Sequence, residues 1–295
     1  MSSTPKISII MPTYNRAALI GESIQSIRNQ TYKNWELIIL DDGSQDNTEV
    51  IVSNFNDQKI KYQKLQHTGI GGKTKNTGLQ ISSGELVAFL DSDDLWADTK
   101  LEKQLTAFDQ NPDAGYCLTG GYNFQEQRVP VDFFYKQKQG RKYGDLFYDC
   151  FTSGLTAFTQ ALLFKKSCLT KCGVFKEDKS FSDVEFIYSL AYNFKGIILY
   201  EPLVYRRLHK DNFIIANWEK SMEEGIKIIQ NFRSKLPKKI WQKSIARSHL
   251  NFAEKYIKIR QHSKALRHEI KAWQYQPFSF NAPKKIVKTI LHYFK

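Results

Sequence analysis

Residues 7–44 read ISIIMPTYNRAALIGESIQSIRNQTYKNWELIILDDGS, and this stretch decides the fold. Ile7 to Met11 is a β-branched apolar run that stops at a Pro-Thr-Tyr-Asn break. From Ala18 to Gln30, apolar residues recur at the spacing of one helical face. A second apolar run, Trp35 to Leu40, leads into the acidic turn that begins at Asp41. The order of these segments predicts strand, helix and strand, the start of an α/β domain.

The alternation continues to residue 90. The pattern predicts a helix after Asp46, and then a strand at Ile60 to Gln63, a helix at Lys75 to Ser82 and a strand at Leu86 to Leu90. Strands that are apolar on both faces indicate a mostly parallel sheet covered by helices. The loops that begin at Pro12, Asp41 and Asp91 each follow a strand, so we expect them at the ligand-binding edge of this sheet.

The rest of the chain has a different pattern. Residues 111–215 contain short aromatic-rich strands around a helix from Asp183 to Tyr192, and long helical patterns such as Ile240 to Tyr256 follow beyond Trp218. We expect a catalytic domain over 1–215, with a nucleotide-binding half (1–110) and an acceptor half (111–215). Residues 216–295 are expected to form a basic helical region.

Charge is distributed unevenly along the chain. The net charge is +13, and residues 205–295 carry 21 Lys and Arg side chains against 6 Asp and Glu, which suggests an anionic partner such as a membrane or a nucleic acid. The apolar runs are far shorter than the ~20 residues that span a bilayer, and no secretory signal is visible, so a cytoplasmic protein is expected. Its four cysteines lack C-x-x-C spacing and are predicted to be reduced, buried thiols.

The most unusual local feature is an acidic cluster directly after the fourth predicted strand. Asp91, Asp93 and Asp94 follow Phe89-Leu90. Crowded carboxylates repel each other unless a cation or hydrogen-bond donors neutralise them, so the cluster favours a divalent metal bound to a ligand phosphate. Mg²⁺ or Mn²⁺ suits oxygen ligands best. The alternative is a polar loop in which Asp94 or Asp98 caps the next helix.

A second acidic turn ends the strand at Leu40. One carboxylate of Asp41 or Asp42 could accept a hydrogen bond from a base N–H or a ribose hydroxyl. An Asx-turn that leads into the helix after Asp46 would explain the same residues without any ligand.

Together these motifs closely resemble the family 2 glycosyltransferases over about residues 6–110. The motifs are Ile9 to Arg16 (IIMPTYNR), Ile39 to Thr48 (ILDDGSQDNT), Lys75 to Gly78 (KNTG), Ser83 to Glu85 (SGE) and Phe89 to Asp94 (FLDSDD). The resemblance implies a GT-A fold, a nucleotide-sugar donor and inversion of the anomeric centre.

The resemblance also implies roles for single residues. Pro12, Thr13 and Tyr14 would line the nucleotide pocket, and Asp42 would contact uracil. Asp91 and Ser92 would lie near the ribose. Asp93 would hold Mn²⁺ or Mg²⁺ on the diphosphate.

Lys75 departs from the family pattern, which often has Arg-Asn where this chain has Lys75-Asn76. Lysine keeps the charge but lacks the bidentate fork of arginine. Lys75 is therefore a candidate nucleotide contact, and the alternative is a plain surface lysine.

On the acceptor side, Gln160 to Leu190 resembles the family's pattern, with Ser182 where a Glu usually precedes the Asp. Asp183 would then be the catalytic base, with Glu185 as the second choice, because inverting transfer needs a carboxylate beside the acceptor hydroxyl. The alternative is that Ser182 and Asp183 only cap a helix. His209 resembles a family position near the active site, where it could complete the metal shell or contact the diphosphate. The alternative is a lone surface histidine.

The sequence thus predicts an inverting glycosyltransferase that moves a sugar, most simply from a UDP-sugar, to a hydroxyl of a glycan or lipid-linked acceptor in polysaccharide biosynthesis. The two alternatives are a nucleotidyltransferase on a similar fold and a basic nucleic-acid-binding protein, and the acidic loops argue against nucleic acid as a partner. Residues Pro283 to Lys295 form an amphipathic pattern that could bind an anionic membrane from the cytoplasmic side, or pack on the protein itself.

Overall fold

The computed structural model describes residues 4–125, 128–135, 138–152, 155, 158–178, 182–209 and 217–277. The chain forms two compact units. The first consists of Met1–Phe147 and Thr156–His209, and the second of Tyr148–Leu155 and Lys210–Lys295. The unit that contains the sheet therefore ends at residue 209, and a short segment from the middle of the chain belongs to the helical unit.

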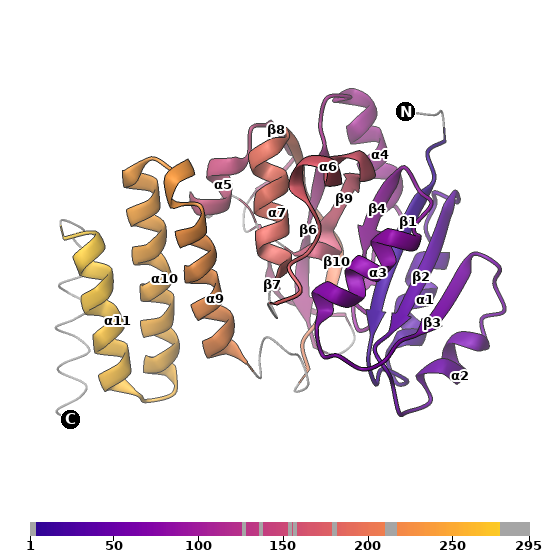
Figure 1. Ribbon diagram of the computed structural model, residues 1–295, viewed down its shortest axis with the longest axis horizontal. Coiled ribbons are helices and arrows are strands. Elements are labelled where there is room, and N and C mark those ends of the chain that lie inside the picture. Colours follow the sequence, from indigo (N-terminus) through magenta and orange to yellow (C-terminus); the bar gives the residue numbers. More distant parts are fainter. Residues whose placement is uncertain are drawn as a thin grey trace. The chain divides into compact units, whose positions relative to one another are not determined.

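One sheet organises the first unit (Figure 1). Its strands run in the order β3-β2-β1-β4-β9-β6-β10-β5, while β7 pairs with β6 and β8 pairs with β10. The strands are β1 (Ile7–Thr13), β2 (Trp35–Asp41), β3 (Ile60–Lys64), β4 (Leu86–Phe89), β5 (Leu95–Trp96), β6 (Tyr116–Phe124), β7 (Pro130–Phe133), β8 (Arg141–Gly144), β9 (Leu162–Lys165) and β10 (Gly196–Arg207).

The helices of this unit connect the strands. They are α1 (Ile20–Arg28), α2 (Thr48–Ser53), α3 (Gly71–Ile81), α4 (Lys100–Gln110), α6 (Leu169–Cys172) and α7 (Ser182–Asn193), with α5 (Phe147–Thr152) at the border of the units. Short 3₁₀ turns cover Thr159–Ala161 (η1) and Lys166–Cys168 (η2). In Figure 1, α3 and α7 lie on the same face of the sheet, toward the viewer.

The predicted fold class is confirmed. Strands β3, β2, β1 and β4 are all parallel, and β6 and β10 are parallel as well, whereas β9 and β5 run antiparallel to their neighbours. Every residue of β2 and β4 is buried, as their continuous apolar runs predict. Strand β3 differs because it is at the edge of the sheet, and its residues are only partly buried or exposed.

Close packing fixes α3 on the sheet. A Cβ on Gly78 would lie 2.5 Å from Cγ2 of Ile10 in β1, so only glycine lets the helix approach this strand. The predicted helix began at Lys75, but it actually starts at Gly71 because the glycine-rich stretch forms its first turn. Lys75 therefore lies in the second turn of α3 and not at its start.

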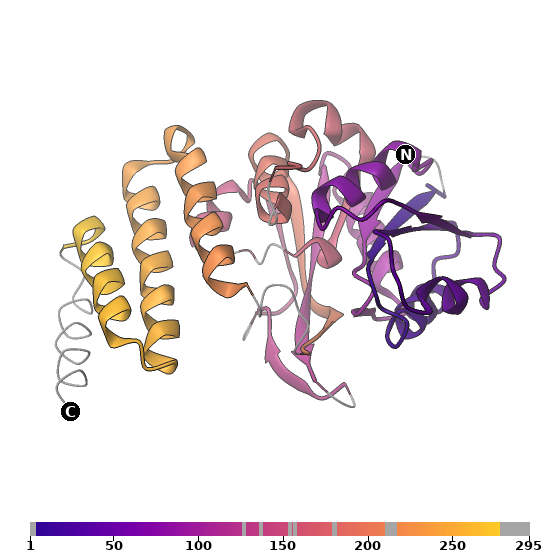
Figure 2. The ribbon, with the colours of Figure 1, turned by 60° about the horizontal axis from the view of Figure 1, so that its bottom comes forward.

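The second unit is helical, as the pattern beyond Trp218 predicts. It contains α9 (Trp218–Asn231), a short 3₁₀ turn at Arg233–Lys235, α10 (Lys238–Lys258) and α11 (His262–Tyr275), which lie side by side in both views (Figures 1 and 2). Its core contains Phe252, Ala253, Tyr256 and Ala265, with Trp218, Met222 and Ile226 packed against it. Helix α11 was not predicted as a separate element.

Two further predictions concern membranes and thiols. Among the described helices, none is both long and apolar enough to cross a bilayer. All four cysteines are free; Cys117, Cys150 and Cys168 are buried, while Cys172 is partly exposed. The amphipathic segment Pro283 to Lys295 lies outside the described residues, so both interpretations of it stay predictions.

Candidate active site

The loops after β1, β2 and β4 start at one edge of the sheet, as expected. Thr13 is paired with Asp41 at the ends of β1 and β2, and the backbone N–H of Asp42 donates to the carbonyl of Thr13 over 2.9 Å. The N–H of Leu90 donates to the carbonyl of Ile10 over 3.1 Å. The parallel register therefore brings three loops together that are distant in sequence.

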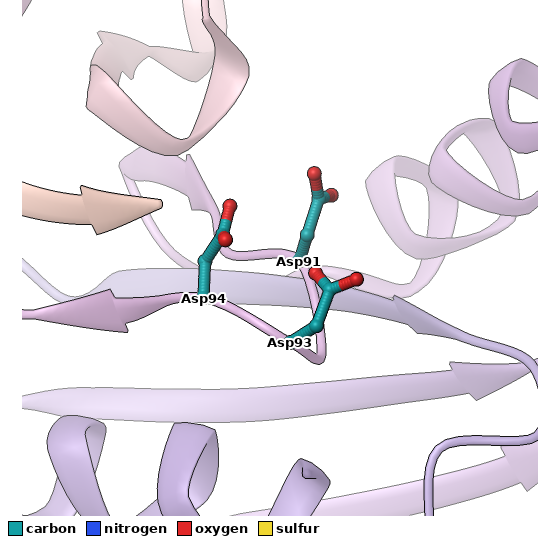
Figure 3. A group of neighbouring side chains, drawn as sticks. All are labelled: Asp91, Asp93 and Asp94. Atoms are coloured by element: carbon teal, nitrogen blue, oxygen red, sulfur yellow. The ribbon is translucent and has the colours of Figure 1, made fainter. Parts of the chain in front are cut away.

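The acidic cluster is the centre of this edge (Figure 3). Asp91, Asp93 and Asp94 each offer a carboxylate oxygen, and these three oxygens all lie within 4.8 Å of one another. The group suits a divalent cation, because closely spaced carboxylate oxygens are the ligands that such ions prefer. Neither Asp94 nor Asp98 caps the next helix, since α4 begins after Thr99 without a side-chain cap.

The pKa values of this cluster reflect its crowding. Burial, reinforced by the charges of Asp93 and Asp183, raises the pKa of Asp91 to about 6, although the Lys75 ammonium opposes the rise. Burial and the charges of Asp93 and Asp91 also hold the pKa of Asp94 well above its usual range. A bound cation would relieve this repulsion and keep the carboxylates ionised.

Gln160 supports the cluster, and sequence reasoning did not find it. Its side-chain amide donates to Oδ2 of Asp94 over 2.8 Å and also to Oδ2 of Asp91. The other oxygen of Asp94 accepts the backbone N–H of Arg207 over 2.8 Å. Both oxygens of Asp94 thus have protein donors, so Asp94 supports the loop more than it offers a free ligand.

Asp93 lies beside one histidine and one arginine side chain. Nε2 of His209 is 3.0 Å from Oδ2 of Asp93, and Nε of Arg16 is 3.4 Å from the same oxygen. The His209 side chain is only 19% exposed, so it is not an isolated surface histidine. The structure therefore brings together the two residues predicted to hold the metal.

Lys75 and Asp183 form a contact that the sequence did not predict, and only the lysine is buried. Nζ of Lys75 lies 2.7 Å and 2.6 Å from the two carboxylate oxygens of Asp183, and Lys75 is 5% exposed. The surface-lysine interpretation is therefore wrong. Asp183 also accepts a hydrogen bond from Oγ1 of Thr159 over 3.1 Å. Glu185 is partly buried in the same first turn of α7.

The predicted uracil contact, Asp42, is largely occupied by its own loop. Its carboxylate accepts the backbone N–H groups of Thr68 and Gly69 over 2.9 Å and 2.8 Å, and it is 3.1 Å from Nδ1 of His67. Gly43 is needed in this turn, because its φ is +82° and a Cβ there would lie 3.1 Å from the N of His67. Asp42 therefore holds the loop that contains Thr68 and Gly69 in place, and it does so at the ligand-binding edge of the sheet.

An aromatic pair borders the same loop. Tyr14 is 38% exposed and stacks on the ring of His67, with the centroids 4.3 Å apart and the planes 24° apart. Thr13 and Ser92 are buried, and Pro12 is partly buried. Within the described part of the chain, Oγ1 of Thr13 is buried without a hydrogen-bond partner. A flat aromatic surface beside a buried hydroxyl suits a heterocyclic base and its ribose.

The Asx-turn interpretation of the second acidic turn is correct for one residue. Oδ1 of Asp46 accepts the backbone N–H of Thr48 over 3.0 Å. Burial would raise the pKa of Asp46, but hydrogen bonds from Thr48 and from the backbone of Ala17 lower it below its usual value. Asp41 has a structural role too, because it accepts the N–H of Ser44 over 2.7 Å and the hydroxyl of Tyr62. Asp42 is therefore the residue of this turn with a side chain beside the aromatic pair.

Several residues at the site carry no signal in the sequence. Gln160, Thr159 and His67 contact the predicted residues, yet each is separated from its partner by at least 24 positions. The family resemblance over Gln160 to Leu190 pointed to the segment that contains Gln160, but it did not single out Gln160 itself. Contacts across such separations depend on the folded sheet.

Comparison with known proteins places this geometry in a family. The model of the family described as glycosyl transferase family 2 matches residues 8–167. A Campylobacter jejuni protein named GalNAc(5)-diNAcBac-PP-undecaprenol beta-1,3-glucosyltransferase is 30% identical over 278 residues, which cover 89% of this chain and 86% of that protein. The match therefore includes both units.

Two other relatives match only in part. Escherichia coli WfgD, named as a UDP-Glc:alpha-D-GlcNAc-diphosphoundecaprenol beta-1,3-glucosyltransferase, is 45% identical over 36% of this chain and 42% of its own length. Bacillus subtilis TuaG, a putative teichuronic acid biosynthesis glycosyltransferase, is 34% identical over 48% of this chain and 56% of its own length. These matches leave much of both relatives uncovered.

Solved structures share the fold. Residues 1–349 of S. aureus TarS, in complex with UDP-GlcNAc, superpose with a TM-score of 0.66 at 20% identity over 92% of this chain and 81% of that one. The mannosyltransferase PcManGT of Pyrobaculum calidifontis, in complex with GDP-Man and Mn²⁺, gives a TM-score of 0.65 at 18% identity over 100% of this chain and 82% of that one. At these identities the likeness concerns the fold alone.

Proposed function

This chain belongs to glycosyl transferase family 2, and we propose that it transfers a sugar from a nucleoside-diphosphate donor to an acceptor hydroxyl with inversion at the anomeric carbon. One observation carries the proposal. A carboxylate cluster that suits a divalent cation is accompanied by a separate carboxylate, Asp183, and the ammonium of Lys75 contacts Asp183 while its charge also interacts with that of Asp91. Single-displacement transfer needs this combination of a donor site and a base.

We assign the donor to the loops after β1, β2 and β4. Tyr14 would stack on the base, with Asp42 beside it, and Pro12 and Thr13 would line the nucleotide pocket. Asp91 and Ser92 would lie near the ribose. Apart from His209, the proposed donor contacts are within residues 1–110, and the acceptor is proposed to bind to residues 111–215.

Asp93 and His209, together with Asp91, would hold Mn²⁺ or Mg²⁺. Their oxygen and nitrogen atoms suit such an ion, whereas Asp94 is held by Gln160 and the backbone of Arg207. When bound, the cation supplies positive charge that stabilises the leaving diphosphate.

Asp183 is proposed as the base, with Glu185 as the second candidate. It takes the proton of the acceptor hydroxyl as the acceptor oxygen forms a bond to the anomeric carbon. The bond from that carbon to the diphosphate oxygen breaks, and the nucleoside diphosphate leaves with the electron pair. One displacement inverts the configuration. The Asp183 side chain is 34% exposed, so an acceptor can reach it.

The relatives suggest which substrates to test first. Two of them are named as glucosyltransferases acting on diphosphoundecaprenol-linked sugars, so we propose UDP-glucose as the donor and a lipid-linked glycan as the acceptor. Such acceptors lie at a membrane, which fits peripheral attachment of the basic helical region to the inner face of the bilayer. Polysaccharide biosynthesis at the cell surface is the corresponding process.

The experiment is to incubate the full chain with Mn²⁺, a UDP-sugar and a lipid-linked acceptor, and to measure UDP release and product formation. Asp183→Asn should lower turnover by roughly 10²–10⁴-fold while UDP binding persists. Glu185→Gln is the matched control and should retain most activity if Asp183 is the base. Near-normal turnover of Asp183→Asn would remove it from the mechanism. A salt-dependent DNA-binding assay tests the nucleic-acid alternative.

A further inference from the structure

Lys75 lies on the buried face of α3. The buried residues of α3 include Gly72, Lys75, Asn76 and Leu79, a spacing that forms one helical stripe. The stripe faces the core, so the Lys75 ammonium is placed inside the protein. Lys73, two residues earlier on the same helix, is exposed. Lysines on α3 are therefore not buried in general, and the burial of Lys75 is due to its position on the helix.

A buried ammonium is unfavourable unless an opposite charge compensates for its lost hydration. The ring centres of Phe175 and Phe89 lie 5.5 Å and 6.0 Å from Nζ of Lys75. The ionic partner of Lys75 is Asp183. Burial alone would lower the pKa of Lys75, but the negative charges of Asp183 and Asp91 raise it above its usual value. The charges of a donor-side carboxylate and of the acceptor-side carboxylate thus both act on the ammonium, and Asp183 is the one in contact with it.

The contact leaves one oxygen of Asp183 with more free capacity than the other. A carboxylate oxygen can accept about two hydrogen bonds. Oδ2 accepts from both Lys75 and Thr159, over 2.6 Å and 3.1 Å. Oδ1 accepts from Lys75 over 2.7 Å, and no second donor reaches it from the described residues. Oδ1 therefore keeps a lone pair for an incoming hydroxyl.

The neighbouring residue fixes the segment that leads toward α7. The side-chain amide of Asn76 donates to the carbonyl of Phe175 over 2.9 Å, and its oxygen accepts the N–H of Phe175 over 3.0 Å. The same amide donates to Glu177 over 2.8 Å. Lys75 and Asn76 thus both connect α3 to the acceptor half, one at the carboxylate and the other at the backbone.

We propose that Lys75 is a positioning residue that holds Asp183 with Oδ1 turned toward the acceptor hydroxyl, and that it acts on sugar transfer through Asp183 and not through the nucleotide. This inference rests on the proposed function, because it assigns Asp183 as the base. It replaces the nucleotide contact expected from the sequence at this position.

A double-mutant cycle tests the inference. The variants are Lys75→Met, Asp183→Asn and the double variant, and kcat and the donor KM are measured for each, with UDP affinity by calorimetry. Methionine has a similar length and no charge, so the helix packing is preserved. Lys73→Met is the matched control on the exposed side of α3. Thr159→Val removes the uncharged hydrogen bond to Oδ2, together with the longer 3.5 Å contact between Nζ of Lys75 and Oγ1 of Thr159, and leaves the ion pair in place.

Lys75→Met should lower kcat by about 10–100-fold, the loss expected when a catalytic group is misplaced, while the donor KM and UDP affinity change less than about threefold. In the Asp183→Asn background the same substitution should change kcat by less than about threefold, because the group through which it acts is already absent. Lys73→Met should match the wild type, and Thr159→Val should lower kcat less than Lys75→Met does.

Equal losses in the two backgrounds, or a large fall in UDP affinity, would show a direct donor contact and overturn the inference. An unchanged kcat in Lys75→Met would overturn it too. If Lys75→Met fails to fold, the double variant is used instead, because it removes both charges of the pair. Its kcat and UDP affinity are compared with those of Asp183→Asn. A kcat or a UDP affinity clearly lower than that of Asp183→Asn would count against the inference. Wild-type protein without transferase activity on any donor would instead refute the proposed function.

Discussion

Replacing Lys100 tests how the protein tolerates a charge in its core. Lys100 begins α4 and has no exposed surface, and its Nζ lies 2.8 Å from Oε1 of Gln104 and 4.0 Å from the centre of the Trp96 ring. No carboxylate pairs with it among the described residues. Burial therefore lowers the pKa of Lys100 from 10.5 to about 7, although the nearby Cys117 opposes the shift.

The sign of the pH dependence follows from proton binding. Between pH 7 and pH 10.5 the unfolded chain holds a proton on Lys100 that the folded protein has lost, so the free energy of unfolding rises with pH in this range. Each pH unit is worth about 1.4 kcal/mol. From pH 7 to pH 9 the contribution of Lys100 to the free energy of unfolding should therefore rise by roughly 2–3 kcal/mol.

Lys100→Met removes this titration. We expect the free energy of unfolding of the wild type, minus that of the variant, to rise by about 2–3 kcal/mol from pH 7 to pH 9. Urea unfolding followed by circular dichroism at several pH values measures it. Lys103→Met is the control, because Lys103 is on the same helix in an exposed pair with Glu201 and its difference should stay nearly flat.

A flat difference for Lys100→Met would refute this reasoning. It would mean that Lys100 stays charged in the folded protein at pH 7 to 9. The face of Trp96 and the oxygen of Gln104 would then stabilise the ammonium enough to offset its burial.

Three further predictions concern the metal site and the tail. Asp93→Ala should weaken Mn²⁺-dependent UDP binding at least about tenfold, because the cation loses a ligand; unchanged calorimetric binding would refute that role. Gln160→Leu should lower the metal-free unfolding free energy by about 1–3 kcal/mol, since Asp91 and Asp94 lose a shared donor, and an unaltered melting temperature would contradict it. A chain that ends at Asn281 should lose salt-sensitive binding to anionic liposomes in co-sedimentation, whereas equal binding by both chains rejects the tail as an anchor.

The sequence by itself determined the nucleotide-binding half of the fold. Its strands are continuous apolar runs and its helices follow the period of 3.6 residues, so local patterns were enough to order β1 to β4 with their helices. The position of the acidic cluster followed as well, because in a parallel sheet the residue after each strand must come to the same edge. The acidic residues Asp91, Asp93 and Asp94 could therefore be singled out before their geometry was known.

Only the tertiary structure decided how the two halves of the site meet. The contact between Lys75 and Asp183 joins positions 108 residues apart, and Gln160 reaches Asp91 across 69 positions. No local pattern encodes such pairs, since they depend on how α3 and the turn before β9 pack against the sheet. For the same reason the sequence left Lys75 as either a nucleotide contact or a surface lysine, whereas the fold buries it against Asp183. A helical pattern shows which residues share a face, but only packing decides which opposite charge compensates a buried one.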